Sequence, residues 1–219
     1  MDIVVFGATG MMGSRIVAEA ASRGHAVTAV SRSGQLPEGV DGQVTPAVGD
    51  AKDPARVAEL VKGAGVVAGA LVGPRDGTDP REPFLQLYTD FLSGVRDGGA
   101  PRTVIVGGAG TLLVAPGTRL VDLPDFPEAY KPEALAHGAL LDMLRAGTAL
   151  PTWTYISPAP EVGPGERTGS FRLGVGDDLL PGAGRISAED YAIAFVDELE
   201  TGVYPRRRLS VAQAIAQTA

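Results

Sequence analysis

The chain contains 219 residues, of which 44% are hydrophobic and 21% charged, and its formal net charge is −7 at pH 7. This length suffices for one α/β domain with a full core, so we expect a single domain over residues 1–219. The chain has no cysteine, which excludes disulfides, thiolate chemistry and cysteine-ligated metal sites. The negative charge disfavours a nucleic-acid partner, and with only two histidines we expect no metal site.

Signals that direct a chain to a membrane are not found in the sequence. No apolar run approaches the length that spans a bilayer, and the amino terminus enters a strand without a basic region or a cleavage site. We therefore expect a cytoplasmic protein with no membrane partner, which acts on a small-molecule substrate as a monomer or a small homo-oligomer.

The amino terminus predicts a strand at 3–6, a glycine turn and a helix at 14–22, because an apolar run is followed by apolar residues at helical spacing. A helix entered from such a turn directs unpaired N–H groups and the positive end of its dipole at a ligand, where a pyrophosphate fits. Gly7 allows a tight turn, Gly10 lets the backbone approach phosphate oxygens, and Gly13 lets the helix pack on the strand. The alternative is a glycine turn with a structural role only. The candidate pyrophosphate-binding residues are Gly7, Ala8, Thr9, Gly10, Met11, Met12 and Gly13.

The residues after a second predicted strand, 25–30, bear on which dinucleotide binds. In a dinucleotide-binding fold, the adenosine ribose lies after the second strand. An acidic side chain there accepts hydrogen bonds from the ribose 2′-hydroxyl, whereas an arginine pairs with a 2′-phosphate. The chain has no acid here and carries Ser31, Arg32 and Ser33 instead. We therefore expect NADP(H) to be preferred over NAD(H); the alternative is that Arg32 is only a solvated loop residue.

The middle of the chain continues to alternate strands and helices. Asp53 followed by Pro54 is typical of a helix start, since aspartate accepts from unpaired N–H groups and proline suits the first helical position. The polar loop 73–83 follows a strand, and open α/β sheets bind ligands beyond the carboxyl ends of their strands. The elements predicted here are strands at 44–48 and 64–72 and helices at 53–62 and 84–96.

A fifth predicted strand, 103–106, is followed by the glycine-rich sequence GGAG. These glycines either make a simple turn or leave room for the nicotinamide ribose and substrate. Their place after a central strand favours the second interpretation, with Gly107 and Gly108 as candidates. The proline-punctuated segment 113–132 then leads to a helix at 133–145, and because loops of this length are more often functional than idle, we expect a lid over the substrate.

The last third of the chain predicts further elements near the substrate. We assign the segments at about 111–132 and 158–186 to the substrate side. The elements predicted are a strand at 152–156, a loop at 157–165, a small hairpin or cover at 171–180, a helix begun by a capping box at 187–190, and a last edge strand at 206–211.

Six motifs, in this order, resemble the short-chain dehydrogenase/reductase superfamily, and more closely its atypical NmrA-like or flavin-reductase-like branch. They are GATGMMG at 7–13, SRSG at 31–34, GD at 49–50, GGAG at 107–110, SPA at 157–159 and SAEDYA at 187–192. The resemblance implies a Rossmann fold, an α/β doubly wound parallel sheet with helices on both faces and here a small carboxyl-terminal extension at the substrate side. It also implies that Arg32 lies near the adenosine phosphate, Asp50 near the adenine ring, Ala70 and Leu71 along the cofactor and Pro158 beside the nicotinamide.

The chain departs from the superfamily at the catalytic pair. Typical members use Tyr-x-x-x-Lys, in which the lysine lowers the tyrosine pKa so that the hydroxyl exchanges a proton with the substrate. None of the five tyrosines here has a lysine four residues on. Tyr130, which precedes Lys131, is the candidate proton donor, with His137 as a second; a structural or lid tyrosine is the alternative.

Three functions are therefore consistent with the sequence. The first is an NADPH-dependent reductase of a small carbonyl, quinone or flavin-like substrate. Hydride transfer to an electron-poor acceptor can proceed without a Tyr-x-x-x-Lys pair, because the protein supplies the orientation and the solvent supplies the proton. The second is a non-catalytic NADP(H)-sensing regulator with a protein partner, as NmrA-like proteins are. The third is an NAD(P)-dependent epimerase or dehydratase, although little chain remains for a sugar-nucleotide domain.

Overall fold

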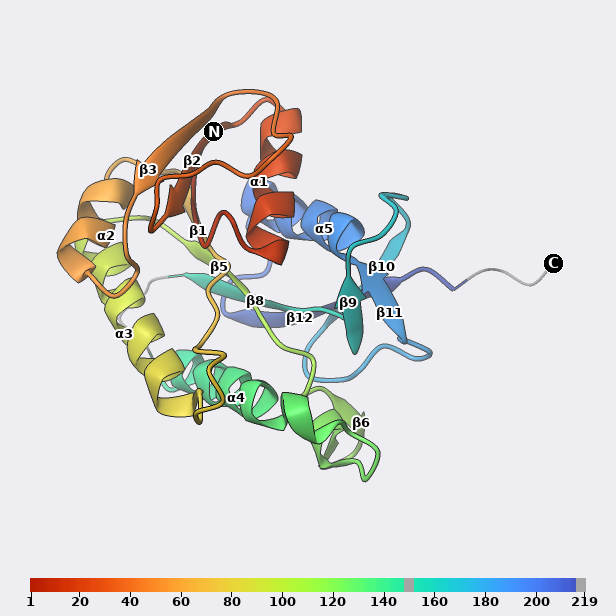
Figure 1. The fold of residues 1–219 in the computed structure, drawn as a ribbon. Helices are drawn as coiled ribbons and strands as arrows, with labels where there is room; N and C mark the ends of the chain where they lie inside the picture. The colour runs from red at the N-terminus through yellow and green to blue at the C-terminus, as the bar shows by residue number, and fades with distance from the viewer. Residues whose placement is uncertain (148–151, 216–219) are drawn as a thin grey trace.

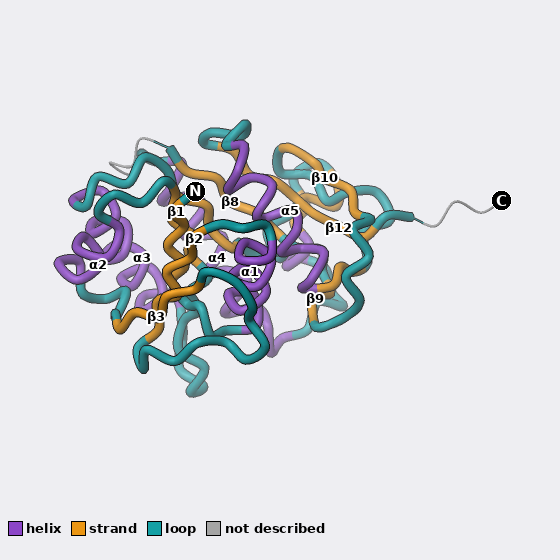
Figure 2. The backbone as a smooth tube through the Cα atoms, turned by 90° about the horizontal axis from the view of Figure 1, so that it is seen from above, coloured by secondary structure: helices purple, strands orange, loops and turns teal. Residues whose placement is uncertain are grey.

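A computed structural model describes residues 1–147 and 152–215 of the chain. Eight strands form one sheet in the order β10-β12-β8-β5-β4-β1-β2-β3, in which all neighbours are parallel except β10 and β12. Figure 2 shows β3 and β10 at opposite ends of this sheet. The strands are β1 Asp2–Phe6, β2 Ala26–Ser31, β3 Val44–Val48, β4 Val66–Gly69, β5 Thr103–Val106, β8 Trp153–Ser157, β10 Phe171–Val175 and β12 Arg207–Gln213.

Helices cover both faces of the sheet, as the Rossmann prediction requires. The α-helices are α1 Met11–Ser22, α2 Pro54–Val61, α3 Arg81–Asp97, α4 Lys131–Arg145 and α5 Ala188–Thr201. Figure 1 shows α1 and α5 on one side of the sheet and α3 and α4 on the other. Among the described residues, no helix has the length and apolar character needed to cross a membrane.

Strand β1 divides its side chains between these two layers. Ile3 and Val5 pack into a core with α1 and α5, whereas Val4 and Phe6 pack into a second core with α2, α3 and α4. Successive side chains of a strand point to opposite faces, so a strand that is apolar throughout requires cover on both sides. The continuous apolar run is therefore the reason that β1 lies inside the sheet.

The predicted helix starts are confirmed at two places. The Asp53 carboxylate accepts a hydrogen bond from the Arg56 backbone N–H at the start of α2. The Ser187 hydroxyl accepts one from the Asp190 N–H at the start of α5. Each interaction satisfies a donor that the helix itself leaves unpaired.

The carboxyl-terminal strands differ from the prediction. Residues 171–180 were expected to form a hairpin or cover, but β10 joins the main sheet antiparallel to β12 and forms its edge. Strand β12 is therefore an interior strand and not the predicted edge. The physical reason is that β10 supplies backbone partners along the outer side of β12, whose N–H and C=O groups would otherwise be unpaired.

The predicted lid segment is partly regular. Residues 113–132 contain a small antiparallel pair, β6 Leu113–Ala115 and β7 Thr118–Arg119, and two short 3₁₀ turns before α4. A second small pair, formed by β9 Glu161–Gly163 and β11 Arg185–Ser187, lies in the other substrate-side segment. Figure 1 shows the second pair next to β10, and β11 lies against β12 of the main sheet.

Candidate dinucleotide site

The turn between β1 and α1 needs two of its three glycines for steric reasons. Gly7 has φ +77°, and a Cβ there would lie 2.2 Å from the Ala70 carbonyl oxygen. A Cβ on Gly13 would lie 2.0 Å from the Gly7 carbonyl oxygen. Gly10 is different, since its Cβ would come only to 3.3 Å from that same oxygen. The turn is therefore packed tightly against β4 and α1, and its surface at Gly10 stays open.

The start of α1 has the properties of an anion site. Its amino-terminal capping residue, Gly10, supplies no side-chain cap, and the first turn contains no acidic residue. The first N–H groups of a helix have no acceptor within the helix. Thr9, Gly10 and Met11 are exposed, so these donors and the positive end of the helix dipole are accessible to a pyrophosphate.

The end of β2 lies beside this turn and leaves one arginine available. The Ser31 hydroxyl donates to the Gln35 carbonyl oxygen at 3.2 Å, and the Ser33 hydroxyl accepts from the Gln35 N–H at 3.4 Å. Both serines thus shape the loop. Arg32 is exposed, and within residues 1–147 and 152–215 no hydrogen bond or ion pair is found for its side chain, so it is available for a 2′-phosphate.

The other predicted cofactor residues follow neighbouring strands. Asp50 comes after β3 and is exposed, and its carboxylate accepts from the Lys52 N–H at 3.0 Å. Ala70 and Leu71 follow β4, and the Ala70 N–H donates to the Phe6 carbonyl at 3.0 Å. Pro158 follows β8. Because β1, β2, β3, β4, β5 and β8 are parallel, all these residues lie along the same edge of the sheet.

Gly107 and Gly108 have a packing role that the sequence did not indicate. A Cβ on Gly107 would lie 2.3 Å from the Tyr155 ring, and one on Gly108 would lie 2.9 Å from the His137 Cβ. The Gly108 N–H donates to the Tyr155 hydroxyl at 2.9 Å. These glycines therefore accommodate two buried side chains beneath the loop, and their predicted role beside the nicotinamide stays a prediction.

Tyr155 and His137 form a buried pair under this loop. The Tyr155 hydroxyl donates to the His137 carbonyl at 3.1 Å, and the His137 Nδ1 lies 3.2 Å from the same hydroxyl. Burial lowers the pKa of His137 to about 4 and raises that of Tyr155 to about 12. Both side chains are thus uncharged at neutral pH, and His137, only 8% exposed, is not the surface-accessible acid that a donor requires.

Tyr130 lies at the start of α4 and is 65% exposed. Its neighbour Lys131 forms an ion pair with Glu128, one turn earlier. Among the described residues, no hydrogen bond joins the Tyr130 hydroxyl to an ammonium group. Tyr130 as proton donor stays a prediction.

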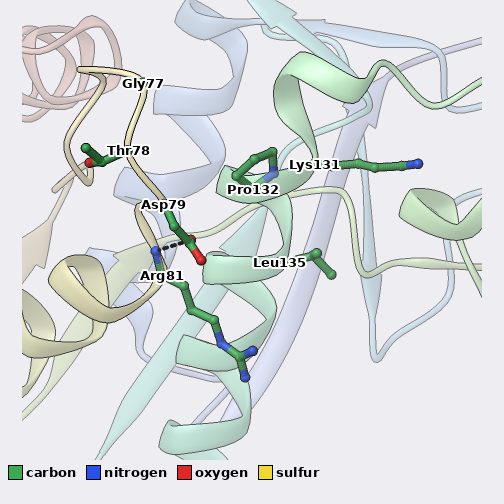
Figure 3. Close-up of a pocket in the computed structure, with 7 residues that line it drawn as sticks. All are labelled: Gly77, Thr78, Asp79, Arg81, Lys131, Pro132 and Leu135. Carbon is green, nitrogen blue, oxygen red and sulfur yellow. Dashed lines mark hydrogen bonds between the residues drawn. The ribbon is translucent and has the colours of Figure 1, made fainter.

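A cavity of about 440 Å³ opens between the loop after β4 and the start of α4 (Figure 3). Asp79 accepts from the Arg81 N–H at 3.0 Å, which fixes the end of the loop at the start of α3. In Figure 3, the Lys131 side chain points away from Arg81. The cavity is lined by Gly77, Thr78, Asp79, Arg81, Lys131, Pro132 and Leu135. It provides space beside the predicted substrate region.

Arg208 is a buried residue at this edge of the sheet that sequence reasoning missed. It belongs to β12, is 2% exposed and hydrogen-bonds to Ser157, Gly108 and Thr111. A run of three arginines before an apolar segment is typical of a strand end that is exposed to solvent. Only strand pairing decides that Arg208, unlike exposed Arg207, points inward.

The family model described as NAD(P)H-binding matches residues 7–201. The chain belongs to this NAD(P)H-binding family. The match begins at the first glycine of the turn and extends through α5, so it includes the whole predicted cofactor edge. The resemblance to the atypical short-chain dehydrogenase/reductase branch is thereby confirmed, as is binding of NAD(P)H as the cofactor class.

Three solved structures resemble the chain over almost its full length. A protein from Burkholderia pseudomallei, provisionally named an exported protein, is 46% identical with a TM-score of 0.83 over 97% of this chain and 99% of that one. A protein from Bacteroides thetaiotaomicron, provisionally named an epimerase, is 35% identical with a TM-score of 0.87 over 99% of this chain and 98% of that one. A protein from Streptococcus pneumoniae, provisionally named an NADH-flavin reductase, is 33% identical with a TM-score of 0.79 over 98% of this chain and 100% of that one.

Proposed function

We propose that this protein is an NADPH-dependent reductase that transfers a hydride to a small carbonyl, quinone or flavin-like acceptor. The observation that carries the proposal is the open start of α1, packed by Gly7 and Gly13, beside the exposed Arg32. The likeness to the Streptococcus protein, named for NADH-flavin reduction, supports this class of reaction. Preference for NADPH rests on Arg32 and on the lack of an acid after β2.

The residues of the chain would orient the cofactor and leave the redox chemistry to it. When bound, reduced nicotinamide supplies a hydride. The N–H groups at the start of α1 would hold the pyrophosphate, and Arg32 would pair with the 2′-phosphate. These contacts would fix the nicotinamide end beside the loops after β5 and β8, and such orientation is a large part of the catalysis of hydride transfer.

The acceptor class follows from the missing proton donor. Tyr155 and His137 are buried and hydrogen-bonded to each other. In the described part of the chain no hydrogen bond joins Tyr130 to a lysine, and its neighbour Lys131 pairs with Glu128. A quinone or flavin takes its proton from water after the hydride arrives, so such an acceptor does not require a proton donor from the protein. A simple carbonyl needs a donor near its oxygen, for which Tyr130 is the candidate.

The proposal is tested by NADPH oxidation in the presence of a panel of flavins, quinones and aldehydes. Gly10→Glu places a carboxylate where the pyrophosphate would bind and should abolish turnover, because the site at Gly10 is open enough to accept the side chain. Gln43→Glu is the matched control, since the same charge is added at an exposed residue before β3, at the opposite end of the parallel strands. Turnover that is equal in both variants would contradict the proposal.

A second candidate function is an NADP(H) sensor that binds the dinucleotide without turnover and passes its occupancy to a protein partner. The lack of a Tyr-x-x-x-Lys pair favours it. Tight NADPH binding with no turnover on any acceptor would support this function. The third candidate function is that of an epimerase or dehydratase, which the likeness to the Bacteroides protein supports. It is tested by measuring whether the purified protein retains NAD(P) through turnover of a sugar nucleotide.

We also propose that the protein acts in the cytoplasm as a monomer or small homo-oligomer. The support for the cytoplasm is the sequence, in which no apolar run has the length that spans a bilayer. Cell fractionation and light scattering of the purified protein test the two parts separately.

A further inference from the structure

Arg208 joins two loops that border the predicted nicotinamide position. Its Nε donates to the Ser157 hydroxyl at 3.0 Å, at the end of β8. Its Nη2 donates to the Gly108 carbonyl at 3.2 Å and its Nη1 to the Thr111 carbonyl at 2.9 Å, both in the loop after β5. One planar guanidinium therefore bonds to two segments that are about fifty residues apart in sequence.

Ser157 closes the network between the same two loops. Its hydroxyl donates to the Gly108 carbonyl at 2.9 Å while it accepts from Arg208. The Gly108 carbonyl thus receives two hydrogen bonds, and the Gly108 N–H is held by Tyr155. The peptide groups on both sides of Gly108 are fixed relative to Pro158, the next residue after Ser157.

Within the described residues the charge of Arg208 is only partly balanced, because its ion pair with a carboxylate is long and that carboxylate is shared with a second arginine. The carboxylate is that of Asp177, which lies 3.4 Å from Nη1 and also pairs with Arg145 at 2.6 Å. Burial of a cation with so little compensation lowers its pKa and opposes folding, and apolar residues of similar volume often serve stability better than buried charges. The position of this arginine is therefore explained better by the loops that it orders than by stability.

Resting on the proposed function, we infer that Arg208 is a positioning residue for the nicotinamide end of the site. Acting through Gly108 and Ser157, it holds the loops after β5 and β8 at the separation that lets the nicotinamide ring lie between them. It does not touch the adenosine end, which is bound near Arg32 at the opposite part of the edge. Its loss should therefore weaken the interactions of one half of the dinucleotide only.

The test compares two ligands by isothermal titration calorimetry. NADPH uses both ends of the site, whereas 2′,5′-ADP carries only the adenosine and its phosphates. In Arg208→Lys, which keeps the charge but loses the planar set of donors, we expect the dissociation constant of NADPH to rise about tenfold or more and that of 2′,5′-ADP to change less than about twofold. Arg207→Lys is the matched control, because the adjacent side chain is exposed.

Steady-state kinetics give a second readout. If an acceptor is turned over, Arg208→Lys should lower kcat through misorientation of the ring, an effect that loss of stability alone does not produce at temperatures well below unfolding. Should Arg208→Lys fail to fold, Ser157→Ala removes one member of the network and should shift NADPH binding in the same selective way.

The outcomes separate the two proposals. Equal weakening of both ligands, or no change in either, would overturn the positioning role while leaving the proposed function intact. If the unmodified protein binds neither NADPH nor 2′,5′-ADP, the proposed function fails, and the inference about Arg208 fails with it.

Discussion

The Tyr155 hydroxyl accepts the N–H of Gly108 at 2.9 Å and lies on the far side of that loop from solvent. Tyr155→Phe would leave this buried N–H without its acceptor. A buried polar group that loses its partner costs about 1–3 kcal/mol. We expect the free energy of unfolding to fall by about that amount, measured by denaturant titration. Tyr204→Phe, at a partly exposed tyrosine, should change it by less than half as much.

His137 should make stability depend on pH. Burial lowers its pKa from 6.5 to about 4 in the folded chain, so below pH 6.5 the unfolded chain binds a proton that the folded chain does not. The associated stability is fully present above pH 6.5 and is lost as the pH falls toward 4, by about 3 kcal/mol in total. Melting temperatures from pH 7.5 to 5 should show this decline in the natural protein and lose it in His137→Gln; below pH 5, carboxylates whose pKa is lowered, such as Glu19 and Glu200, add their own loss in both proteins. His25→Gln, at the other histidine, should retain the decline.

Gly13→Ala should disrupt the turn itself. The added Cβ would lie 2.0 Å from the Gly7 carbonyl oxygen, so α1 must move away from β1. Forced displacement in a packed region typically costs about 1–3 kcal/mol. We expect this loss in unfolding experiments, together with loss of NADPH binding. Gly10→Ala, whose Cβ would come to 3.3 Å, should keep most of the stability; an equal loss in both variants would contradict the geometry.

Arg32→Asp should change the cofactor preference. A carboxylate at this place repels a 2′-phosphate and accepts from a 2′-hydroxyl, so we expect the dissociation constant of NADPH to rise at least about tenfold and that of NADH to stay or fall. Fluorescence titration with both dinucleotides measures the ratio. Arg185→Asp makes the same change in net charge at an exposed site in β11 and should leave the ratio unchanged. Equal effects of Arg32→Asp on both dinucleotides would disprove the assignment.

Tyr130→Phe tests the candidate proton donor. Because the side chain is 65% exposed, its hydroxyl contributes little to stability, and the melting temperature should stay constant. If Tyr130 supplies the proton, kcat with aldehydes should fall about a hundredfold, as loss of general acid catalysis does, while quinone reduction is retained. Unchanged aldehyde reduction would remove Tyr130 from the mechanism.

The sequence by itself determined the strand–turn–helix structure where we expect the cofactor to bind. Residues 3–13 specify much of their structure locally, because the run is apolar on both faces, Gly7 adopts a positive φ, and Gly13 is required by its contact with Gly7, six residues earlier. The contact of Gly7 with Ala70 is long-range and adds to this local requirement. Asp53 and Ser187 predicted their helix starts for the same reason, since a cap acts on N–H groups three residues away. Interactions between residues that are close in sequence produce patterns that can be recognised from the sequence alone.

Only the tertiary structure decided the contacts around Gly107, Gly108 and Arg208. The order β10-β12-β8 places Arg208 beside Gly108, about a hundred residues earlier in the chain, and neither residue type indicates that contact. The same is true of Gly107, whose neighbour is the Tyr155 ring rather than an open loop. A strand carries no information about its position in the sheet beyond the burial of its two faces, so whether an arginine at its start lies in solvent or in the core is decided by pairing with distant strands.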